Sequence, residues 1–288
     1  MEQFFQFLIS GITIGSIYAL TAIGFTIIYN CTQVVNFAQG EFLMLGAMLV
    51  AILVADGVPL VIACIIAVAC VTIVGCLVGA TLLRPLRTGS TLSMIIITVG
   101  ASILIRGIVM LRPDKEAMRV PGFTGEGSLS VAGASFPVQS LWVLGTAAVM
   151  VVLLWAFYRF TLLGRAMRAS ACCKEGARLV GININRMTIL SFAIGAAVGA
   201  VSGIVVAPIT FAQYDMGVML GVKGFCAAII GGMGNFTGGI IAGILLGLLE
   251  SMGAGFVSSA YKDAIAFVIL LLILFARPQG VFGGSKQE

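Results

Sequence analysis

Long apolar runs separated by short polar segments dominate the pattern along this chain. A helix needs roughly 20 apolar residues to cross the hydrocarbon core of a bilayer. We therefore expect an all-α polytopic membrane protein with about eight membrane segments, built as one transmembrane domain over residues 1–288. The runs predict helices at about 6–29, 38–55, 59–83, 91–111, 138–158 and 187–211, a glycine-rich stretch at 224–249, and a last helix ending at Ala276.

Composition supports this interpretation. Apolar residues make up 60% of the chain, charged residues 9%, and the mean hydropathy is +1.15. Soluble domains average about 45–50% apolar and about 25% charged residues. The chain has no histidine, and its seven cysteines show no metal-site spacing, so neither a metal site nor Ser-His catalysis is expected. The first apolar run lacks a basic segment and a cleavage site, which favours a retained helix over a signal peptide.

Basic residues set the expected orientation, because lysine and arginine concentrate in cytoplasmic loops. Six of them lie between residues 159 and 186, and Arg84, Arg87 and the tail after Ala276 carry more. The segment 112–137 has balanced charge, as expected of an outer loop. The N-terminus should therefore lie outside, with the 159–186 loop and the tail in the cytoplasm.

A cytoplasmic tail requires that the stretch 224–249 enter and leave the membrane on the same side, because a single crossing would place the tail outside. Five glycines fall within residues 231–239, and glycine costs ~1 kcal/mol relative to alanine inside a helix. We expect a break there, with half-helices at about 222–231 and 238–250 that dip in and return to the outer face. The alternative is a single crossing, in which the weak charge bias of the tail does not set its side.

Glycines and charges add two expectations. Four-residue glycine spacing predicts close helix packing in lipid; it occurs at Gly11/Gly15, Gly75/Gly79, Gly195/Gly199/Gly203 and Gly239/Gly243/Gly247. Charged residues of the apolar runs lie near expected helix ends, where long side chains can reach the interface; they are Glu41, Arg106, Asp215, Lys223, Glu250, Lys262 and Asp263. The pattern therefore disfavours proton or sodium coupling, which usually requires charge at mid-membrane.

The loop 159–186 is the most informative polar segment. Helix-forming residues at 165–180, followed by Gly181, predict one short amphipathic helix with Ala177, Leu179 and Val180 among its apolar positions. Such a helix can lie on an anionic lipid surface or dock into a groove of a cytoplasmic partner. The residues alone leave both interpretations open.

This loop resembles the ATPase-coupling loop of bacterial ABC importer permeases, specifically the LivH-type permeases of branched-chain (hydrophobic) amino acid uptake. Three further segments resemble the family's early, late glycine-rich and C-terminal motifs in the same order: Val35–Gly46, Gly231–Gly239 and Arg277–Gly283. The early motif commonly carries histidine where this chain has Gln39. Glutamine forms hydrogen bonds but does not titrate, so a proton-dependent role is not expected there.

The resemblance implies a multi-pass permease of the bacterial inner (cytoplasmic) membrane that forms half of a pathway for branched-chain or related hydrophobic amino acids. It implies a second, LivM-type permease, two cytoplasmic ATPase subunits and a periplasmic or lipid-anchored substrate-binding protein, with no nucleic acid partner. ATP and magnesium would bind the ATPases, because this chain has no phosphate-binding loop and no cofactor of its own. The ATPase-coupling residues would be Lys174, Glu175, Gly176, Ala177, Arg178, Leu179 and Gly181.

Two interrupted segments indicate where the pathway lies. Asn36–Gly40 and Asn235–Gly239 share an Asn-Phe pattern, which chance can also produce in a glycine-rich chain. Glycine-interrupted segments in both halves of a transporter often mark broken helices at the substrate path. Together with the resemblance, this assigns the pathway to Asn36, Gln39, Gly40, Glu41, Gly232, Gly234 and Asn235.

Several alternatives remain open at this point. Permeases for urea, amides or sugars belong to the same or a sibling family. An ion-coupled secondary carrier and an intramembrane enzyme represent other classes. The carrier would need titratable groups at mid-membrane, and the enzyme a catalytic constellation that a chain without histidine does not readily provide.

Overall fold

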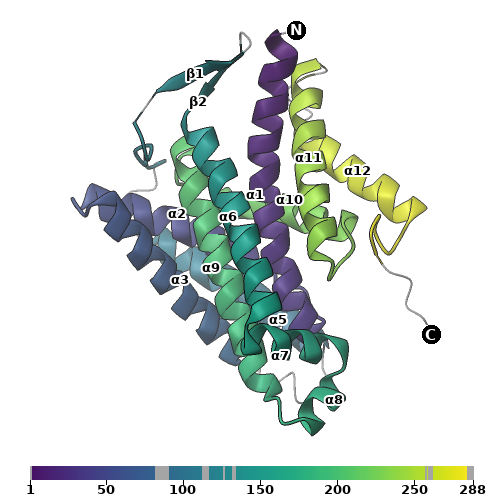
Figure 1. Ribbon diagram of the computed structural model, residues 1–288. Helices are drawn as coiled ribbons and strands as arrows, with labels where there is room; N and C mark the ends of the chain where they lie inside the picture. The colour runs from purple at the N-terminus through teal and green to yellow at the C-terminus, as the bar shows by residue number, and fades with distance from the viewer. Residues whose placement is uncertain are drawn as a thin grey trace.

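The computed structural model describes residues 2–81, 91–111, 117–125, 127–131, 134–256, 258 and 262–283. Arg84, Arg87, the charged residues 112–116 and Lys286, which entered the orientation argument, lie outside these ranges. The described chain forms a bundle of eleven helices with one β-hairpin (Figure 1). The helices are α1 Glu2–Thr32, α2 Gln39–Ala55, α3 Leu60–Thr81, α5 Thr91–Met110, α6 Gln139–Phe160, α7 Leu162–Cys172, α8 Lys174–Leu179, α9 Ile184–Thr210, α10 Met216–Ile230, α11 Phe236–Phe256 and α12 Lys262–Ala276.

The polytopic all-α architecture is confirmed. Within the described ranges, six helices are long and apolar enough to cross a membrane, namely α1, α3, α5, α6, α9 and α11, while α2 and α10 are shorter apolar helices. The sequence did not predict the hairpin of β1 Ser128–Val131 and β2 Ala134–Pro137, which are antiparallel with Ser128 opposite Pro137. It lies at the end of the bundle that holds the N-terminus, whereas α7 and α8 lie at the opposite end (Figure 1).

Helix α1 forms the centre of the bundle. About 89% of its most apolar 18-residue window is buried, against 17% for α5 and for α6, so those two helices present most of their surface outward. α9 and α11 flank α1 on two sides (Figure 1). Because α1 is surrounded by other helices, several of its hydroxyls donate to carbonyls one turn earlier, as Thr21 does to Ile17 O at 2.9 Å, whereas the buried Thr26 hydroxyl has no partner among the described residues.

Glycine faces let α1 and α11 approach closely, as their spacing predicted. A Cβ atom at Gly15 would lie 2.8 Å from Ile244 Cα, and one at Gly11 would lie 2.9 Å from Leu248 Cα. These distances leave no room for a side chain. The two backbones are therefore in contact, which supplies packing energy in lipid, where burial of apolar surface contributes little.

The break in the glycine-rich stretch is confirmed. Helix α10 ends at Ile230 and α11 begins at Phe236. Gly232 and Gly234 between them have φ values of 90° and 96°, a region that residues with a Cβ rarely adopt. The chain reverses here, so the 222–250 region forms a hairpin of helices.

The expectation of two half-helices is wrong for the second arm. α11 has 21 residues and runs antiparallel along nearly all of α1 (Figure 1). Asn30 Nδ2 donates to Gly234 O at 3.1 Å near one end of this contact, and Ser251 Oγ donates to Phe7 O at 2.8 Å near the other. Packing against α1 stabilises a helix that its glycine content alone disfavours.

The C-terminal motif covers the break. Val281 N donates to Ile230 O at 2.7 Å, and Asn235 Nδ2 donates to Phe282 O at 3.0 Å. The late glycine-rich motif and the C-terminal motif therefore form one structural unit. Helix α12 brings this segment back to the break, so the described chain ends beside the last turns of α1, far from the N-terminus.

Candidate translocation cavity and coupling helices

The chain between α1 and α2 forms the first of the two interrupted segments. After Thr32 the backbone turns at Gln33, whose φ is 63°. Asn36 Oδ1 accepts a hydrogen bond from Ala38 N at 3.1 Å, and Gln39 Nε2 donates to Gly195 O of α9 at 2.9 Å. Gln39 is fully buried. Helix α2 therefore begins inside the bundle, held to α9 by a hydrogen bond that needs no titratable side chain.

A cavity of about 230 Å³ lies where the first turn of α2 faces α5 and α10. Its polar wall is formed by Glu41, Ser102 and Arg106, and its aromatic wall by Phe25, Phe37 and Phe225. Gly40, Gly217 and Gly221 complete the contact between α2 and α10. Of the residues assigned to the pathway, Gly40 and Glu41 line this cavity, whereas Asn36 and Gln39 only shape the segment that leads to it.

Glu41 and Arg106 form an ion pair across the cavity wall. Glu41 is 2% exposed, and its Oε1 accepts from Arg106 Nη2 and from Ser102 Oγ, the latter at 3.0 Å. Glu41 does lie in the first turn of a helix, as expected, but that end is buried inside the bundle. The charge of Glu41 is therefore stabilised by its partner Arg106 on α5 and not by access to the membrane interface.

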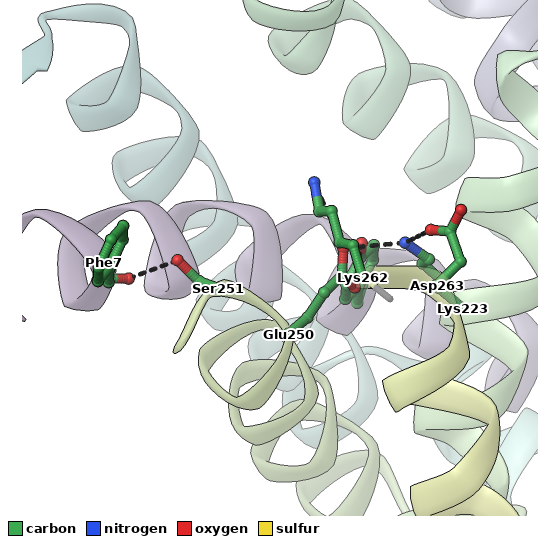
Figure 2. Close-up of polar contacts among 7 residues, drawn as sticks. Phe7, Lys223, Glu250, Ser251, Lys262 and Asp263 are labelled. Atoms are coloured by element: carbon green, nitrogen blue, oxygen red, sulfur yellow. Dashed lines mark hydrogen bonds and ion pairs between the residues drawn. The ribbon is translucent and has the colours of Figure 1, made fainter. Parts of the chain in front are cut away.

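A second charged cluster, formed by Lys223, Glu250, Lys262, Asp263 and Tyr18, joins α10, α11, α12 and α1. Lys223 Nζ lies 2.9 Å from Glu250 Oε1 and 2.6 Å from Asp263 Oδ1, and the Tyr18 hydroxyl donates to Glu250 Oε2 at 2.9 Å. Figure 2 shows the lysine between the two carboxylates. Lys223 and Glu250 are 4% and 1% exposed.

The expectation that these charges reach the membrane interface is wrong for Lys223 and Glu250. Lys223 lies in the middle of α10, and both side chains are buried among helices. A buried charge is tolerated when an opposite charge and hydrogen bonds compensate it. Asp215, which precedes α10, is exposed and does lie at a helix end.

The second interrupted segment lies apart from the cavity. Gly232, Gly234 and Asn235 form the break between α10 and α11 and contact Asn30 and the C-terminal motif. Asn235 Oδ1 accepts from Gly238 N at 3.0 Å and so caps the start of α11, whereas Asn36 Oδ1 accepts from Ala38 N in the turn before α2. In both Asn-Phe segments the asparagine therefore bonds to the backbone near the start of the following helix, but only the early segment leads into the cavity.

Valine at both Gly232 and Gly234 should abolish transport. A Cβ at Gly232 would lie 2.6 Å from Gly283 N, one at Gly234 would lie 2.8 Å from Asn30 Oδ1, and both φ values are positive. The break would have to open and release the C-terminal motif. Uptake by membrane vesicles and protein yield after solubilisation measure the effect. Gly100→Val is the matched control, because a Cβ there meets no atom within 4 Å; transport at the normal rate by the double variant would contradict the requirement for a glycine break.

The loop 159–186 contains two helices, so the prediction of a single helix at 165–180 is wrong. Cys173 separates α7 from α8 with φ −149° and ψ 107°, and its Sγ accepts from Gly176 N at 3.3 Å. The extended residue and its capping thiol break the run of helix formers. The end at Gly181 is confirmed: its φ is 83°, and Ile182 N donates to Ala177 O at 2.9 Å.

Helix α8 has an anchored side and a free side. Ala177 is 3% exposed, whereas Leu179 and Val180 are 88% and 75% exposed, and Glu175 and Arg178 are also exposed. On the anchored side, Lys174 Nζ donates to Thr32 O, the last residue of α1, at 3.1 Å. Desolvation lowers the pKa of this ammonium, and Arg178 lowers it further.

These features describe a polytopic helical membrane protein of the transport class, with charged pairs among its helices, an open cavity beside α2 and a short exposed helix at one end. The family described as branched-chain amino acid transport system, permease component, matches residues 7–274. The chain belongs to this family, and the resemblance seen in its motifs is confirmed.

Individual relatives agree along the whole chain. The high-affinity branched-chain amino acid transport system permease BraD of Pseudomonas aeruginosa is 34% identical over 304 residues, which cover 99% of this chain and 98% of BraD. LivH of Escherichia coli K12 is 34% identical over 307 residues, covering 100% and 99%. The ribose import permease RbsC of the same strain is 25% identical over 269 residues, covering 89% and 81%.

The fold is similar to that of a solved structure. PsaBC from Streptococcus pneumoniae, in complex with a Fab, aligns with a TM-score of 0.51 and 14% sequence identity. The alignment covers 97% of this chain and 93% of that one. The likeness concerns the fold alone.

Proposed function

We propose that this chain is the permease subunit of a bacterial ABC importer and forms half of the pathway for branched-chain or related hydrophobic amino acids. The main support is that the chain is 34% identical, over essentially its full length, to two permeases named for high-affinity branched-chain amino acid transport. The ribose permease is less similar, which ranks a sugar substrate second. Family membership also argues against an ion-coupled carrier, whose energy source would lie within the chain.

On this proposal, ATP and magnesium bind two partner ATPases, and a second permease completes the pathway in the inner membrane. The coupling surface is the free side of α8, where Leu179 and Val180 form an apolar patch beside Glu175 and Arg178. An acidic residue on this face disfavours docking to an anionic lipid surface. A groove on a protein partner suits the mixture of charged and apolar groups.

A short route leads from α8 to the cavity. Lys174 holds Thr32 O, and the Thr32 hydroxyl donates to Val34 O at 3.1 Å within the segment that leads to Gly40 and Glu41. A displacement of α8 would therefore pull on the segment that begins α2. This contact provides a physical means by which a partner at α8 could change the cavity.

Lys174→Gln should weaken this link without removing the free side of α8. We expect the rate of uptake to fall by about tenfold, the equivalent of one charge-assisted hydrogen bond, while the ATPase subunits still copurify. Arg186→Gln, at an exposed position in the first turn of α9, serves as the charge-matched control. Equal uptake by the two variants would remove Lys174 from the route.

The proposal itself is tested by reconstitution. Genes adjacent to this one should encode a second permease, two ATPases and a binding protein, and the assembled importer is placed in proteoliposomes with labelled L-leucine. Uptake should require ATP on the ATPase side and persist when ionophores collapse ion gradients. ATP-independent, ionophore-sensitive uptake would instead establish a secondary carrier. Uptake of ribose or urea but not of leucine would instead assign the chain to a related importer for that solute.

A further inference from the structure

The cavity between α2, α5 and α10 has two chemically different walls. On one side, a carboxylate and a guanidinium of opposite charge lie next to each other at Glu41 and Arg106. On the other side, Phe25 and Phe37 both contact Phe225, with ring centroids 5.5 Å and 6.0 Å apart. A ligand that fills this space meets both signs of charge at one end and aromatic surface at the other.

The ion pair has hydrogen-bonding capacity to spare. Glu41 Oε1 receives the hydrogen bonds from Arg106 and Ser102, whereas Glu41 Oε2 and Arg106 Nε have no hydrogen-bond partner within the described part of the chain. Buried polar atoms in folded proteins nearly always have partners. If the pair served only to hold α2 to α5, a second hydrogen bond between the two side chains would satisfy both atoms.

The size of the cavity restricts the ligand. About 230 Å³ is below the ~300–1,000 Å³ of sites for drug-sized molecules, so the ligand is small. A sugar or urea has no formal charges to match the pair and little apolar surface for three phenylalanines. An apolar amine or an apolar acid would match only one of the two charges.

We propose that this cavity binds a single zwitterionic α-amino acid with an apolar side chain. The ammonium of the ligand lies toward Glu41, its carboxylate toward Arg106, and its side chain among Phe25, Phe37 and Phe225. This inference rests on the proposed function and adds to it: the permease itself recognises both charges of the amino acid. Arg106 and the three phenylalanines then join Gly40 and Glu41 in the pathway.

The test separates recognition of each charge. The assembled importer in nanodiscs, without its binding protein, is equilibrated with labelled L-leucine. Competition is measured with 4-methylpentanoate, which lacks the ammonium, and with 3-methylbutylamine, which lacks the carboxylate. Wild-type protein should prefer leucine to each analogue by about 10- to 100-fold, the range expected for one hydrogen bond to a charged group.

Each variant should erase one preference. Glu41→Gln should weaken leucine binding and leave 4-methylpentanoate binding unchanged, so that the preference over this analogue disappears. Arg106→Gln should weaken leucine binding and leave 3-methylbutylamine binding unchanged, so that the preference for leucine over this amine disappears. Arg165→Gln, which removes a charge at an exposed position on α7 outside the cavity, is the control and should retain both preferences. A merely structural ion pair predicts instead that all three ligands weaken together or not at all, and either result overturns the proposal.

A third variant covers the case in which the charge variants do not fold. Phe37 is 45% exposed, so Phe37→Ala should leave the fold intact and reduce the preference for leucine over L-alanine. An unchanged preference in that variant, or no leucine binding by the wild type, also overturns the site.

Failure of this site and failure of the proposed function remain distinguishable. ATP-driven leucine uptake by the wild type with unchanged preferences in the variants rejects the site alone, whereas absence of that uptake rejects the function.

Discussion

Lys223→Met should lower the stability of the protein by about 3–5 kcal/mol, because removing one partner of a buried ion pair leaves the other charge uncompensated. Lys223 lies 2.9 Å from Glu250 Oε1 and 2.6 Å from Asp263 Oδ1, and Glu250 is 1% exposed. Without the lysine, the remaining partners of Glu250 among the described residues would be the Tyr18 hydroxyl and the more distant Lys262. The unfolding temperature of the purified importer in detergent and the yield of monodisperse protein measure the loss.

Lys262→Met is the matched control for this prediction. Its side chain is 41% exposed and lies 3.4 Å from the same carboxylate, so its removal should change stability by less than about 1 kcal/mol. The double variant Lys223→Met with Glu250→Gln should recover part of the loss, since the uncompensated charge is then also removed. If Lys223→Met unfolds at the wild-type temperature, the cluster does not hold α10 to α11 and α12.

Joint replacement of Glu175 and Arg178 by alanine should reduce uptake to background while ATP hydrolysis by the partner subunits continues. Both side chains are exposed on α8 beside Leu179. In the part of the chain that the structure describes, Ala177 and Lys174 supply the anchored side of α8, so the replacement leaves that anchoring in place. The measurement is the number of leucine molecules imported per ATP hydrolysed in proteoliposomes.

Two controls accompany this second prediction. Membrane insertion of the double variant should match the wild type, because no residue of the transmembrane helices changes. Arg165→Gln, at an exposed position on α7, should leave the ratio of leucine to ATP unchanged. Normal coupled uptake by the Glu175 and Arg178 variant would remove the coupling role from α8.

Much of the architecture follows directly from the order of residues. Helices expected at 91–111, 138–158 and 187–211 are observed at Thr91–Met110, Gln139–Phe160 and Ile184–Thr210. These elements could be predicted because a helix in lipid must satisfy its own backbone hydrogen bonds. A run of about 20 apolar residues then has few other structures available. The break at Gly231–Asn235 was predictable for the same local reason, since glycine tolerates the φ values of 90° and 96° found there.

Features that depend on distant contacts were missed. The length of α11 depends on its packing against α1, where Gly15 and Ile244 are separated by more than two hundred residues. The break at Cys173 depends on a thiol that caps α8, a role that cysteine seldom plays and that no local pattern indicates. In each case a tertiary or capping interaction outweighed a modest helix propensity.

By itself, the sequence determined that this protein lies in a membrane, where most of its long apolar helices lie along the chain, and to which family it belongs. These properties depend on local hydrophobicity and on motifs. The tertiary structure alone decided which charges are partners: Glu41 with Arg106 from α5, and Lys223 with Glu250 and Asp263. It also decided that the early interrupted segment leads into a cavity while the late one is sealed by the C-terminal motif. The physical reason is that pairing of buried charges and closure of a cavity depend on how helices cross in space, which hydropathy along one chain does not encode.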